Sequence, residues 1–311
     1  MVESKHGWLE ARCLLSARVR LASDPPPPRR MPAAFRLGFT MDGRAHVHYN
    51  ATFSWVKFEV PRAYSREEIQ ALVAKVQKAE TSYYRATDTE LYRALEDVQR
   101  LDGMAVGILG SLEPWYEAVA IAYGAATVTT VEYNQCKYQH PKVRTKTVDQ
   151  YWGEADEDRE QFDVVLSISS VEHDGLGRYG DPIDPDGDLK AMEKLRRMTK
   201  PGGRLFLAVP VGPDTVVWNL HRVYGKARLP LLLRGWTLLG TYGYSPTMVH
   251  LEAFRHQHHQ PVFLLENTDP GDAGESLAWL VALEEENGPE TSLVRDERGE
   301  RGILVQKLVL S

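Results

Sequence analysis

Short apolar runs alternate with segments of helical periodicity between residues 104 and 265. Such runs suit strands that are buried on both faces of a parallel sheet. We expect strands at the apolar runs 104–109, 164–168, 205–209 and 261–265, at the β-branched segment 127–131, and a weaker one at 144–148. Because helices separate these strands, the pattern predicts an α/β fold with a doubly wound, mostly parallel sheet and right-handed crossovers.

Capping signals and periodic apolar residues mark the helices between these runs. A helix is expected over 114–123, with a proline in its first turn and Gly124 at its end. A second carries Leu189, Met192, Leu195 and Met198 on one side. Asp188 is the expected N-cap of this helix, and Pro201, Gly202 and Gly203 are expected to end it.

Four regions are expected along the chain. Residues 1–32 contain four consecutive prolines and predict a flexible leader or linker. Residues 33–102 predict a helical and β extension, with a strand within 47–60 and a capping box of Ser65 and Glu68 at the start of a helix. The sheet unit occupies 103–267. Residues 268–311 predict a C-terminal extension, with a helix near 275–286 and a strand near 302–310.

Charge and cysteine usage restrict the partners and the compartment. Lys and Arg number 37 against 43 Asp and Glu, a formal charge of −6, which disfavours a nonspecific nucleic-acid partner. Cys13 and Cys136 cannot form a disulfide scaffold, so a reducing, cytoplasmic compartment is favoured. No apolar run is long enough to span a bilayer. The oligomeric state stays open.

The residues that follow the predicted strands are the candidate site, because ligands of open parallel sheets bind beyond the carboxyl ends of the strands. The first strand carries Gly107 and leads into Gly110 and Ser111, the second ends at Glu132, and the fourth leads into Ser169. We expect these loops to meet around one hollow. Tight packing would explain the two glycines about as well as ligand binding would. An acidic residue such as Glu132 often ends a strand simply because it faces solvent.

Two segments resemble class I S-adenosylmethionine-dependent methyltransferases. FDVVLSISSVEH at 162–173 is similar to the fourth strand and following loop of that family, and KPGGRLFLAVP at 200–210 to its fifth strand. The resemblance covers roughly 103–266. A closer resemblance is to a nematode-type domain of unknown function placed near these enzymes. GSLEPWYEA at 110–118, TVEYN at 130–134, the segment 169–181 and NLHRVYG at 219–225 carry it.

The resemblance implies a Rossmann-like methyltransferase fold and S-adenosylmethionine as cofactor. It assigns the cofactor's amino-acid end to Gly107, Gly110 and Ser111, its ribose to Glu132, its adenine to Asp149, and its sulfonium to Ser169 and Glu172. The family usually closes its first strand with an acidic residue, whereas this strand ends in Leu109-Gly110-Ser111. Glu113 or Glu117 could substitute for that acid.

Methyl transfer needs alignment of the acceptor with the activated methyl group, and a hydroxyl acceptor also benefits from a general base. His173, Asp174 and His221 are the candidates, although a structural role for His221 is equally open. The expected function is methyl transfer to a small polar or glycan-like acceptor. The alternative is an inactive binding or scaffold module. A nicotinamide oxidoreductase is disfavoured because the G-x-G-x-x-G turn is absent after the first strand.

Two groups of residues raise the question of a metal. The aspartates of 181–188 lack the distal glutamate of a calcium loop, so a turn is the simpler interpretation. His250, His256, His258 and His259 lack the closed ligand pattern of a zinc site. We therefore expect no bound metal.

Overall fold

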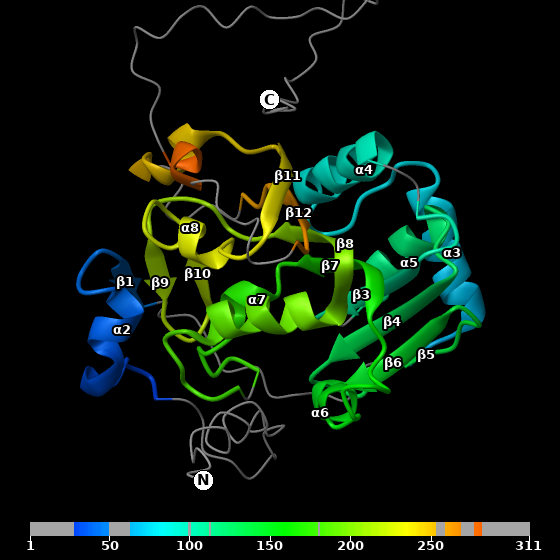
Figure 1. Ribbon diagram of the computed structural model, residues 1–311, viewed down its shortest axis with the longest axis horizontal. Coiled ribbons are helices and arrows are strands. Elements are labelled where there is room, and N and C mark those ends of the chain that lie inside the picture. The colour runs from blue at the N-terminus through cyan, green and yellow to red at the C-terminus, as the bar shows by residue number, and fades with distance from the viewer. Residues whose placement is uncertain are drawn as a thin grey trace, which may run out of the picture.

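The structure is a computed structural model that describes residues 28–49, 63–98, 101–111, 113–179, 181–252, 259–268 and 277–281. Within these ranges a seven-stranded sheet forms the centre of the protein (Figure 1). Its strands are β3 (Ala105–Leu109), β4 (Thr127–Glu132), β6 (Val143–Thr147), β7 (Phe162–Ile168), β8 (Thr199–Ala208), β11 (Thr237–Tyr242) and β12 (Val262–Glu266).

The order of strands across this sheet is β6-β4-β3-β7-β8-β12-β11. The first five strands of the order pair in parallel, and β12 runs antiparallel to both of its neighbours. The chain order of the five parallel strands is therefore that of the doubly wound fold, with its switch point between β3 and β7. This confirms the predicted α/β class and the mostly parallel, Rossmann-like sheet.

Alternate residues of the central strands enter two hydrophobic cores, one on each face of the sheet. Val164, Leu166 and Phe206 belong to the core formed with α3, α4 and α5. Val165 and Leu205 belong to the core formed with α6, α7 and α8. Because both faces are covered, nearly every residue of β4 and β7 is buried, which suits the β-branched sequence of β4 and the mostly apolar sequence of β7.

In the first core, the start of α3 and the bounds of α5 lie close to the predicted residues. The helix α3 (Arg66–Val76) begins with the predicted capping box, in which the N–H of Glu68 donates to Ser65 Oγ over 3.2 Å and the N–H of Ser65 donates to Glu68 Oε2 over 2.9 Å. The helix α4 (Ala86–Val98) follows it. The chain leaves α5 (Trp115–Ala122) through Gly124, whose φ of +104° favours glycine.

The helices of the second core are α6 (Val148–Trp152), α7 (Gly187–Met198) and α8 (Leu229–Leu232). The predicted N-cap of α7 was wrong: Asp188 is a fully buried residue of the helix, and Asp186 occupies the cap position. The predicted end of α7 was also wrong. The chain enters β8 at Thr199, and the Pro-Gly-Gly segment belongs to that strand, where the pairing with β7 shifts register.

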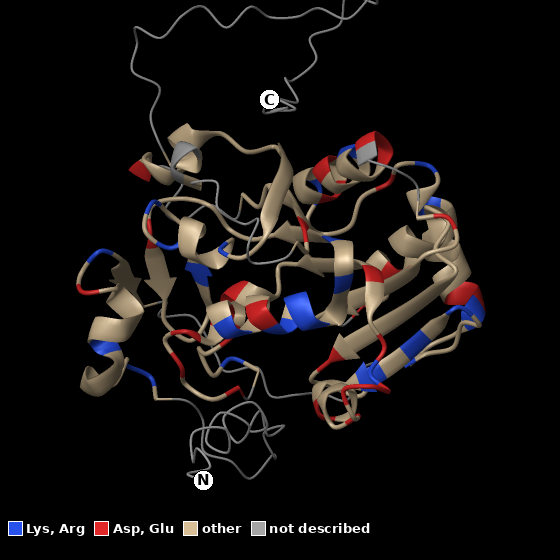
Figure 2. Ribbon diagram, viewed as in Figure 1, with Lys and Arg blue, Asp and Glu red and all other residues tan. Residues whose placement is uncertain are grey.

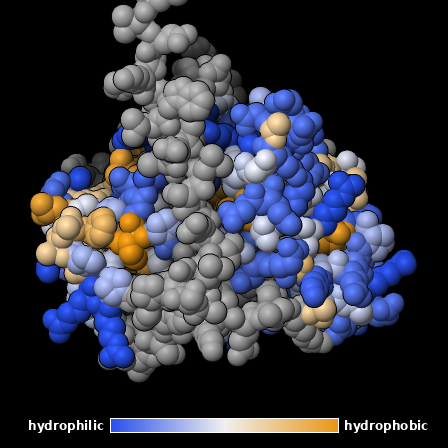
Figure 3. Space-filling view, turned by 90° about the horizontal axis from the view of Figure 1, so that it is seen from below, coloured by the Kyte–Doolittle hydropathy of each residue, from blue (hydrophilic) through white to orange (hydrophobic). Residues whose placement is uncertain are grey.

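Smaller elements surround the central sheet. β1 (His46–His48), β9 (Thr215–Val217) and β10 (His221–Val223) form a three-stranded sheet, and β2 (Ala63–Tyr64) pairs with β5 (Lys137–Tyr138). The helix α2 (Arg36–Thr40) follows a 3₁₀ turn at Ala33–Phe35. Further 3₁₀ turns occupy Val171–His173, Pro246–Val249 and Leu277–Leu280. Figure 3 shows apolar side chains gathered at the end of the molecule where α2 lies.

Several predictions fall outside the described residues. They are the leader up to residue 27, Cys13, most of the strand proposed within 47–60, His256, His258 and the strand near 302–310. Of the helix predicted near 275–286, only 277–281 are described, and they contain a 3₁₀ turn. The division of the chain into four regions stays a prediction. Among the described residues, no helix is both long and apolar enough to cross a membrane.

Candidate functional site

A cavity of about 580 Å³ lies at the carboxyl edge of the parallel strands, beside the switch point. Its volume is within the range of about 300–1,000 Å³ that is common for small-molecule sites. Three strand ends line it: Gly110 and Ser111 after β3, Glu132 and Tyr133 at the end of β4, and Ser169, Ser170, His173 and Asp174 after β7. The structure thus brings together the three loops that the sequence singled out.

The two candidate glycines occupy different environments. Gly110 lines the cavity with a φ of +72°, and a Cβ there would collide with the side chain of Ser170. Gly107 lies inside β3, where a Cβ would be 2.5 Å from the ring of Phe162. Close backbone approach to a ligand is therefore available at Gly110, whereas packing against a neighbouring strand explains Gly107.

The two acids proposed as substitutes for a first-strand acid are in separate layers. Glu113 lines the cavity. Glu117 is fully buried behind it, with Oε2 at 3.0 Å from Ser111 Oγ and Oε1 accepting the hydroxyl of Thr130 over 2.6 Å. Burial raises the pKa of Glu117 to about 7. Of the two, Glu113 can contact a ligand directly, and Glu117 supports the turn that carries Ser111.

Glu132 ends β4 at the wall of the cavity, and only 7% of it is exposed. Its Oε1 accepts two hydrogen bonds of 3.2 Å from Asn134, one from the backbone N–H and one from the side-chain amide. Burial raises the pKa of this carboxyl above its ordinary value. A carboxylate held in this way is suited to accept hydrogen bonds from a diol.

The loop after β7 contains a strained serine. Ser169 has a φ of +53°, which is unusual for a residue other than glycine, and such strain clusters at functional sites. Its Oγ donates to Glu172 Oε1 over 2.7 Å and accepts from Gln260 Nε2 over 3.0 Å. Glu172 and Gln260 are buried beneath the cavity lining, and burial raises the pKa of Glu172 to about 7. Glu172 therefore orients Ser169 from below.

His173 lines the cavity in a defined tautomer. Its Nδ1 lies 2.5 Å from the carbonyl oxygen of Leu220, and because a carbonyl only accepts, Nδ1 carries the proton. Nε2 is then the unprotonated atom of the ring, and it lies 3.5 Å from Oε1 of the buried Glu172. Burial, with the nearby charge of Arg178, lowers the pKa of His173 well below its usual value. His173 is thus a neutral imidazole that can accept a proton or a hydrogen bond through Nε2.

Asp174 is the second candidate base on the cavity wall. The hydroxyl of Tyr133 donates to Asp174 Oδ1 over 3.3 Å. Burial and the neighbouring carboxyl of Asp181 raise the pKa of Asp174 to about 8. Carboxyl groups outnumber amines around the cavity: the lining includes Glu113, Glu132, Asp174, Asp181 and Asp184, against Lys190 and Lys194. A carboxyl group with a pKa of about 8 is mostly protonated at pH 7, so Asp174 adds little negative charge. The other four carboxyl groups still outnumber the two amines, and the lining favours a ligand that carries positive charge.

Two other candidates lie away from the cavity lining. His221 is buried on β10, with its ring centroid 6.3 Å from that of His173, so it packs behind the histidine that lines the cavity. Asp149 is exposed in the first turn of α6, while Val148 and Trp152 of the same helix line the cavity. The geometry therefore does not support the adenine contact expected of Asp149.

Sequence reasoning missed one wall of the cavity, formed by Ser82, Tyr83 and Tyr84. This segment enters α4 and is held by Asp88, whose carboxylate accepts the N–H of Ser82 over 2.5 Å and the hydroxyl of Tyr116 over 3.1 Å. Its distance in sequence from the strands concealed it. It adds aromatic surface to the site.

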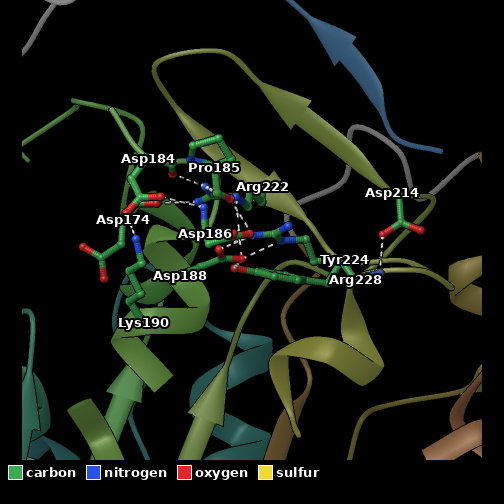
Figure 4. Close-up of polar contacts among 10 residues, drawn as sticks. All are labelled: Asp174, Asp184, Pro185, Asp186, Asp188, Lys190, Asp214, Arg222, Tyr224 and Arg228. Atoms are coloured by element: carbon green, nitrogen blue, oxygen red, sulfur yellow. Dashed lines mark hydrogen bonds and ion pairs between the residues drawn. The ribbon is translucent and has the colours of Figure 1, made fainter. Parts of the chain in front are cut away.

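A buried ionic cluster beneath the cavity was also missed (Figure 4). Arg228 donates to Asp188 Oδ1 over 2.5 Å and to Oδ2 over 2.9 Å, and the hydroxyl of Tyr224 donates to Oδ2 over 3.1 Å. Arg222 Nε lies 3.6 Å from the same carboxylate. Although burial alone would raise it, the two guanidinium groups hold the pKa of Asp188 below its ordinary value. Figure 2 shows the charged residues of α7, the helix that carries Asp188.

The described part of the chain contains no candidate metal site. No group of three or more His, Cys, Asp or Glu side chains there could hold a metal ion. The aspartates of the calcium-like segment have other partners. Asp181 accepts backbone N–H groups from Gly177 and Tyr179, and Asp184 accepts from Lys190.

Comparisons with known proteins bear on the family and on the fold. A family model described as "Caenorhabditis protein of unknown function, DUF268" matches residues 103–268, which confirms the resemblance to a nematode-type domain. No curated protein matches the chain.

Solved methyltransferase structures are similar at low identity. One is 1,6-didemethyltoxoflavin-N1-methyltransferase from Burkholderia thailandensis with bound 1,6-didemethyltoxoflavin and S-adenosylhomocysteine, 17% identical over 72% of this chain and 100% of that one, at a TM-score of 0.41. The N-methyltransferase NodS from Bradyrhizobium japonicum WM9 is 14% identical over 60% and 96%, at 0.38. A putative S-adenosylmethionine-dependent methyltransferase from Listeria monocytogenes is 13% identical over 60% and 100%, at 0.36.

Proposed function

We propose a function from the cavity, since this chain belongs to the family described as "Caenorhabditis protein of unknown function, DUF268", whose description gives no activity. The proposed function is methyl transfer from S-adenosylmethionine to a small polar or glycan-like acceptor. One observation carries the proposal. A cavity at the switch point of a doubly wound sheet is lined by a glycine turn after the first parallel strand and by a carboxylate at the end of the second. Adenosine-containing ligands bind sheets of this topology at that place.

The residues around the cavity fit this cofactor. The backbone at Gly110, where a side chain is sterically excluded, would admit its amino-acid end. Glu132 would accept hydrogen bonds from the ribose diol. Val148 and Trp152 would provide an apolar wall for the adenine. The excess of carboxyl groups around the cavity complements the positive sulfonium.

Bound in this way, the cofactor supplies a methyl group that its sulfonium already activates. The work left to the protein is to orient the acceptor, to exclude water and to take up a proton. His173 Nε2 is available as the proton acceptor because Nδ1 is held by the carbonyl of Leu220. Asp174 lies next to it in the chain and lines the same cavity.

Polar and aromatic groups around His173 favour a small polar acceptor. Tyr84 and Tyr179 line the cavity together with Asp174 and Asp181. Aromatic rings beside hydrogen-bonding groups suit the faces and hydroxyls of sugars or similar polar ligands.

A ligand-binding module without catalysis is the second candidate. It is favoured by the end of β3, where Gly110 follows the strand in place of an acid, and by the position of Glu117 in the buried layer behind the cavity. Such a module would bind the cofactor, or its product, without turning it over.

Calorimetric titration of the full chain with S-adenosylmethionine and S-adenosylhomocysteine tests the proposal. We expect saturable binding by the wild type and a loss of at least tenfold in affinity for Glu132→Ala. The matched control is Glu266→Ala, which removes the carboxylate that ends the antiparallel strand β12 of the same sheet and should bind like the wild type.

Each outcome of the titration has a consequence. Absence of binding by the wild type would refute the proposal, and equal affinity of wild type and Glu132→Ala would remove Glu132 from the site. Binding without turnover of methyl-labelled cofactor across a panel of sugars, polyols and amines would favour the second candidate.

A further inference from the structure

The segment 219–225, with the sequence NLHRVYG, enters the proposed chemistry only through the carbonyl of Leu220, yet several of its residues contact the loop that carries His173 and Asp174. We call residues 219–225 the clamp, and residues 173–179 and 181–188 the cavity loop. The clamp contains β10, which pairs with β9 outside the central sheet. The cavity loop supplies eight of the lining residues: His173, Asp174, Gly175, Tyr179, Asp181, Pro182, Asp184 and Gly187. The two segments are more than thirty residues apart in sequence.

Arg222 makes the largest set of these contacts. Its guanidinium donates to the carbonyl of Asp174 over 2.5 Å, and to those of Asp184 and Pro185 over 3.3 and 3.2 Å. The side chain is only 2% exposed. One planar group therefore ties the two ends of the cavity loop to each other, which the fixed fork of an arginine can do and a lysine cannot.

The start of the clamp holds the first turn of the cavity loop. Asn219, whose φ is +59°, donates its side-chain amide to the carbonyl of Leu176 over 3.1 Å. The carbonyl of Leu220 accepts from His173 Nδ1 over 2.5 Å. The clamp thereby fixes which nitrogen of His173 carries the proton, as carbonyl partners do for many functional histidines.

The end of the clamp is anchored through the buried ionic cluster. Tyr224 and Arg228 both donate to Asp188, and Arg228 also donates to the carbonyl of Pro185 over 2.6 Å (Figure 4). Asp214 holds the turn that carries Arg228 by accepting the N–H groups of Gly225, Ala227 and Arg228 over 2.8–3.0 Å. The clamp is thus fixed at the side away from the cavity.

We propose that Arg222 and Asn219 are positioning residues that fix the backbone of the cavity loop against the carbonyl of Leu220, and so hold His173 with its Nε2 as the accepting atom. This inference rests on the proposed function, because it gives His173 its purpose there. Neither Arg222 nor Asn219 lines the cavity, so both act through His173 and the loop. The preorganised imidazole then requires no change of tautomer when an acceptor binds.

The ring ¹⁵N chemical shifts of His173 test the inference without any acceptor. The full chain is labelled on its histidine rings, and His173 is assigned by the signals that disappear in His173→Gln. In the wild type at pH 7 we expect a protonated Nδ1 and an unprotonated Nε2. Arg222→Lys keeps the positive charge but loses the planar guanidinium that bonds three carbonyl groups of the cavity loop. The loop should then no longer hold His173 against the carbonyl of Leu220, and the tautomer that carries the proton on Nε2 should become populated.

Asn219→Gly and Arg196→Lys complete the set of variants. Glycine accepts the positive φ of residue 219 and removes only the amide donor, so this variant keeps the test decisive if Arg222→Lys does not fold. It should also populate the second tautomer. Arg196 is the matched control because it donates to Asn267 Oδ1 and the carbonyl of Thr268 at the far end of α7. Arg196→Lys should keep the wild-type ring signals.

Titration with S-adenosylhomocysteine in parallel separates this inference from the proposed function. We expect about tenfold weaker binding by Arg222→Lys, equivalent to about 1.4 kcal/mol, because the cavity loop lines the site. Wild-type ring signals in folded Arg222→Lys and Asn219→Gly would overturn the positioning role, as would the same change in Arg196→Lys. A wild type that has the expected tautomer but does not bind S-adenosylhomocysteine would refute the proposed function alone.

Discussion

Replacing Asp188 by asparagine is the sharpest test of the buried cluster that supports the site. The carboxylate is fully buried and receives hydrogen bonds from Arg228 and Tyr224, with Arg222 Nε at 3.6 Å. Asparagine keeps the shape of the side chain but leaves the guanidinium of Arg222 buried without its carboxylate, and it leaves Arg228 only the exposed carboxylate of Asp186 at 3.6 Å. Removal of one partner of a buried ion pair costs about 3–5 kcal/mol of the free energy of unfolding.

This loss would be large on the scale of a folded domain. For a domain of about 150–250 residues, each kcal/mol lowers Tm by about 2–4 °C, so we expect Asp188→Asn to melt about 6–20 °C below the wild type. Urea unfolding followed by circular dichroism gives the free energy, and thermal scans give Tm. The control is Glu193→Gln, which breaks a surface pair with Arg197 whose side chains are 57% and 49% exposed and should cost at most about 1 kcal/mol.

The pH dependence of the same variant gives a second test. The two guanidinium groups lower the pKa of Asp188 in the folded state, so its stabilising contribution is present above the ordinary value of 3.8 and disappears as the pH falls through the folded-state value. The difference in stability between wild type and variant should therefore shrink below about pH 4. A variant within about 1 kcal/mol of the wild type at pH 7 would refute the reasoning, because the two arginines would then not need the carboxylate.

Three further predictions concern the cavity. Burial raises the pKa of Glu117 from 4.5 to about 7, so its contribution to stability is present at low pH and is lost as the pH rises through about 7. The free energy of unfolding, measured by urea unfolding as a function of pH, should therefore fall over this range, and Glu117→Gln should remove about 3 kcal/mol of that fall. An equal fall in wild type and variant would contradict this. Gly110→Ala should cost about 1–2 kcal/mol for its left-handed backbone and weaken S-adenosylhomocysteine by more than tenfold in calorimetry, because the new methyl group meets Ser170; wild-type affinity would argue against ligand approach there. Tyr133→Phe removes a hydrogen bond to the Asp174 carboxylate, so the pKa of Asp174, followed by ¹³C NMR, should rise above its value of about 8, and a fall would show that the hydroxyl does not stabilise the charged form.

Local sequence determined the centre of the fold. The runs that became β3, β7, β12 and the last four residues of β8 are apolar at most positions, and β4 is β-branched, because both faces of the sheet are covered. This signal is readable without any knowledge of partners. The edge strand β11 was not predicted, since its residues are only partly buried and its sequence shows no continuous apolar run. The capping box of α3 was predictable because Ser65 and Glu68 satisfy each other within one turn.

The candidate site was predictable to the extent that topology places strand ends together. Once the sheet is parallel, the residues after β3, β4 and β7 share one edge, so Gly110, Glu132 and Ser169 could be expected around one cavity. Spacing alone could not separate Gly110 from Gly107, which differ in backbone φ and in what a side chain would meet at each position.

The tertiary structure alone decided the partners of the buried polar groups. Asp188 is of a residue type that N-caps helices and precedes a periodic apolar run, yet it pairs with Arg228, forty residues later in the chain. The tautomer of His173 depends on the carbonyl of Leu220, forty-seven residues away. Apolar periodicity and capping are determined by neighbours within a few residues, whereas a buried charge takes its partner from whichever segments the packing of the whole chain brings to it.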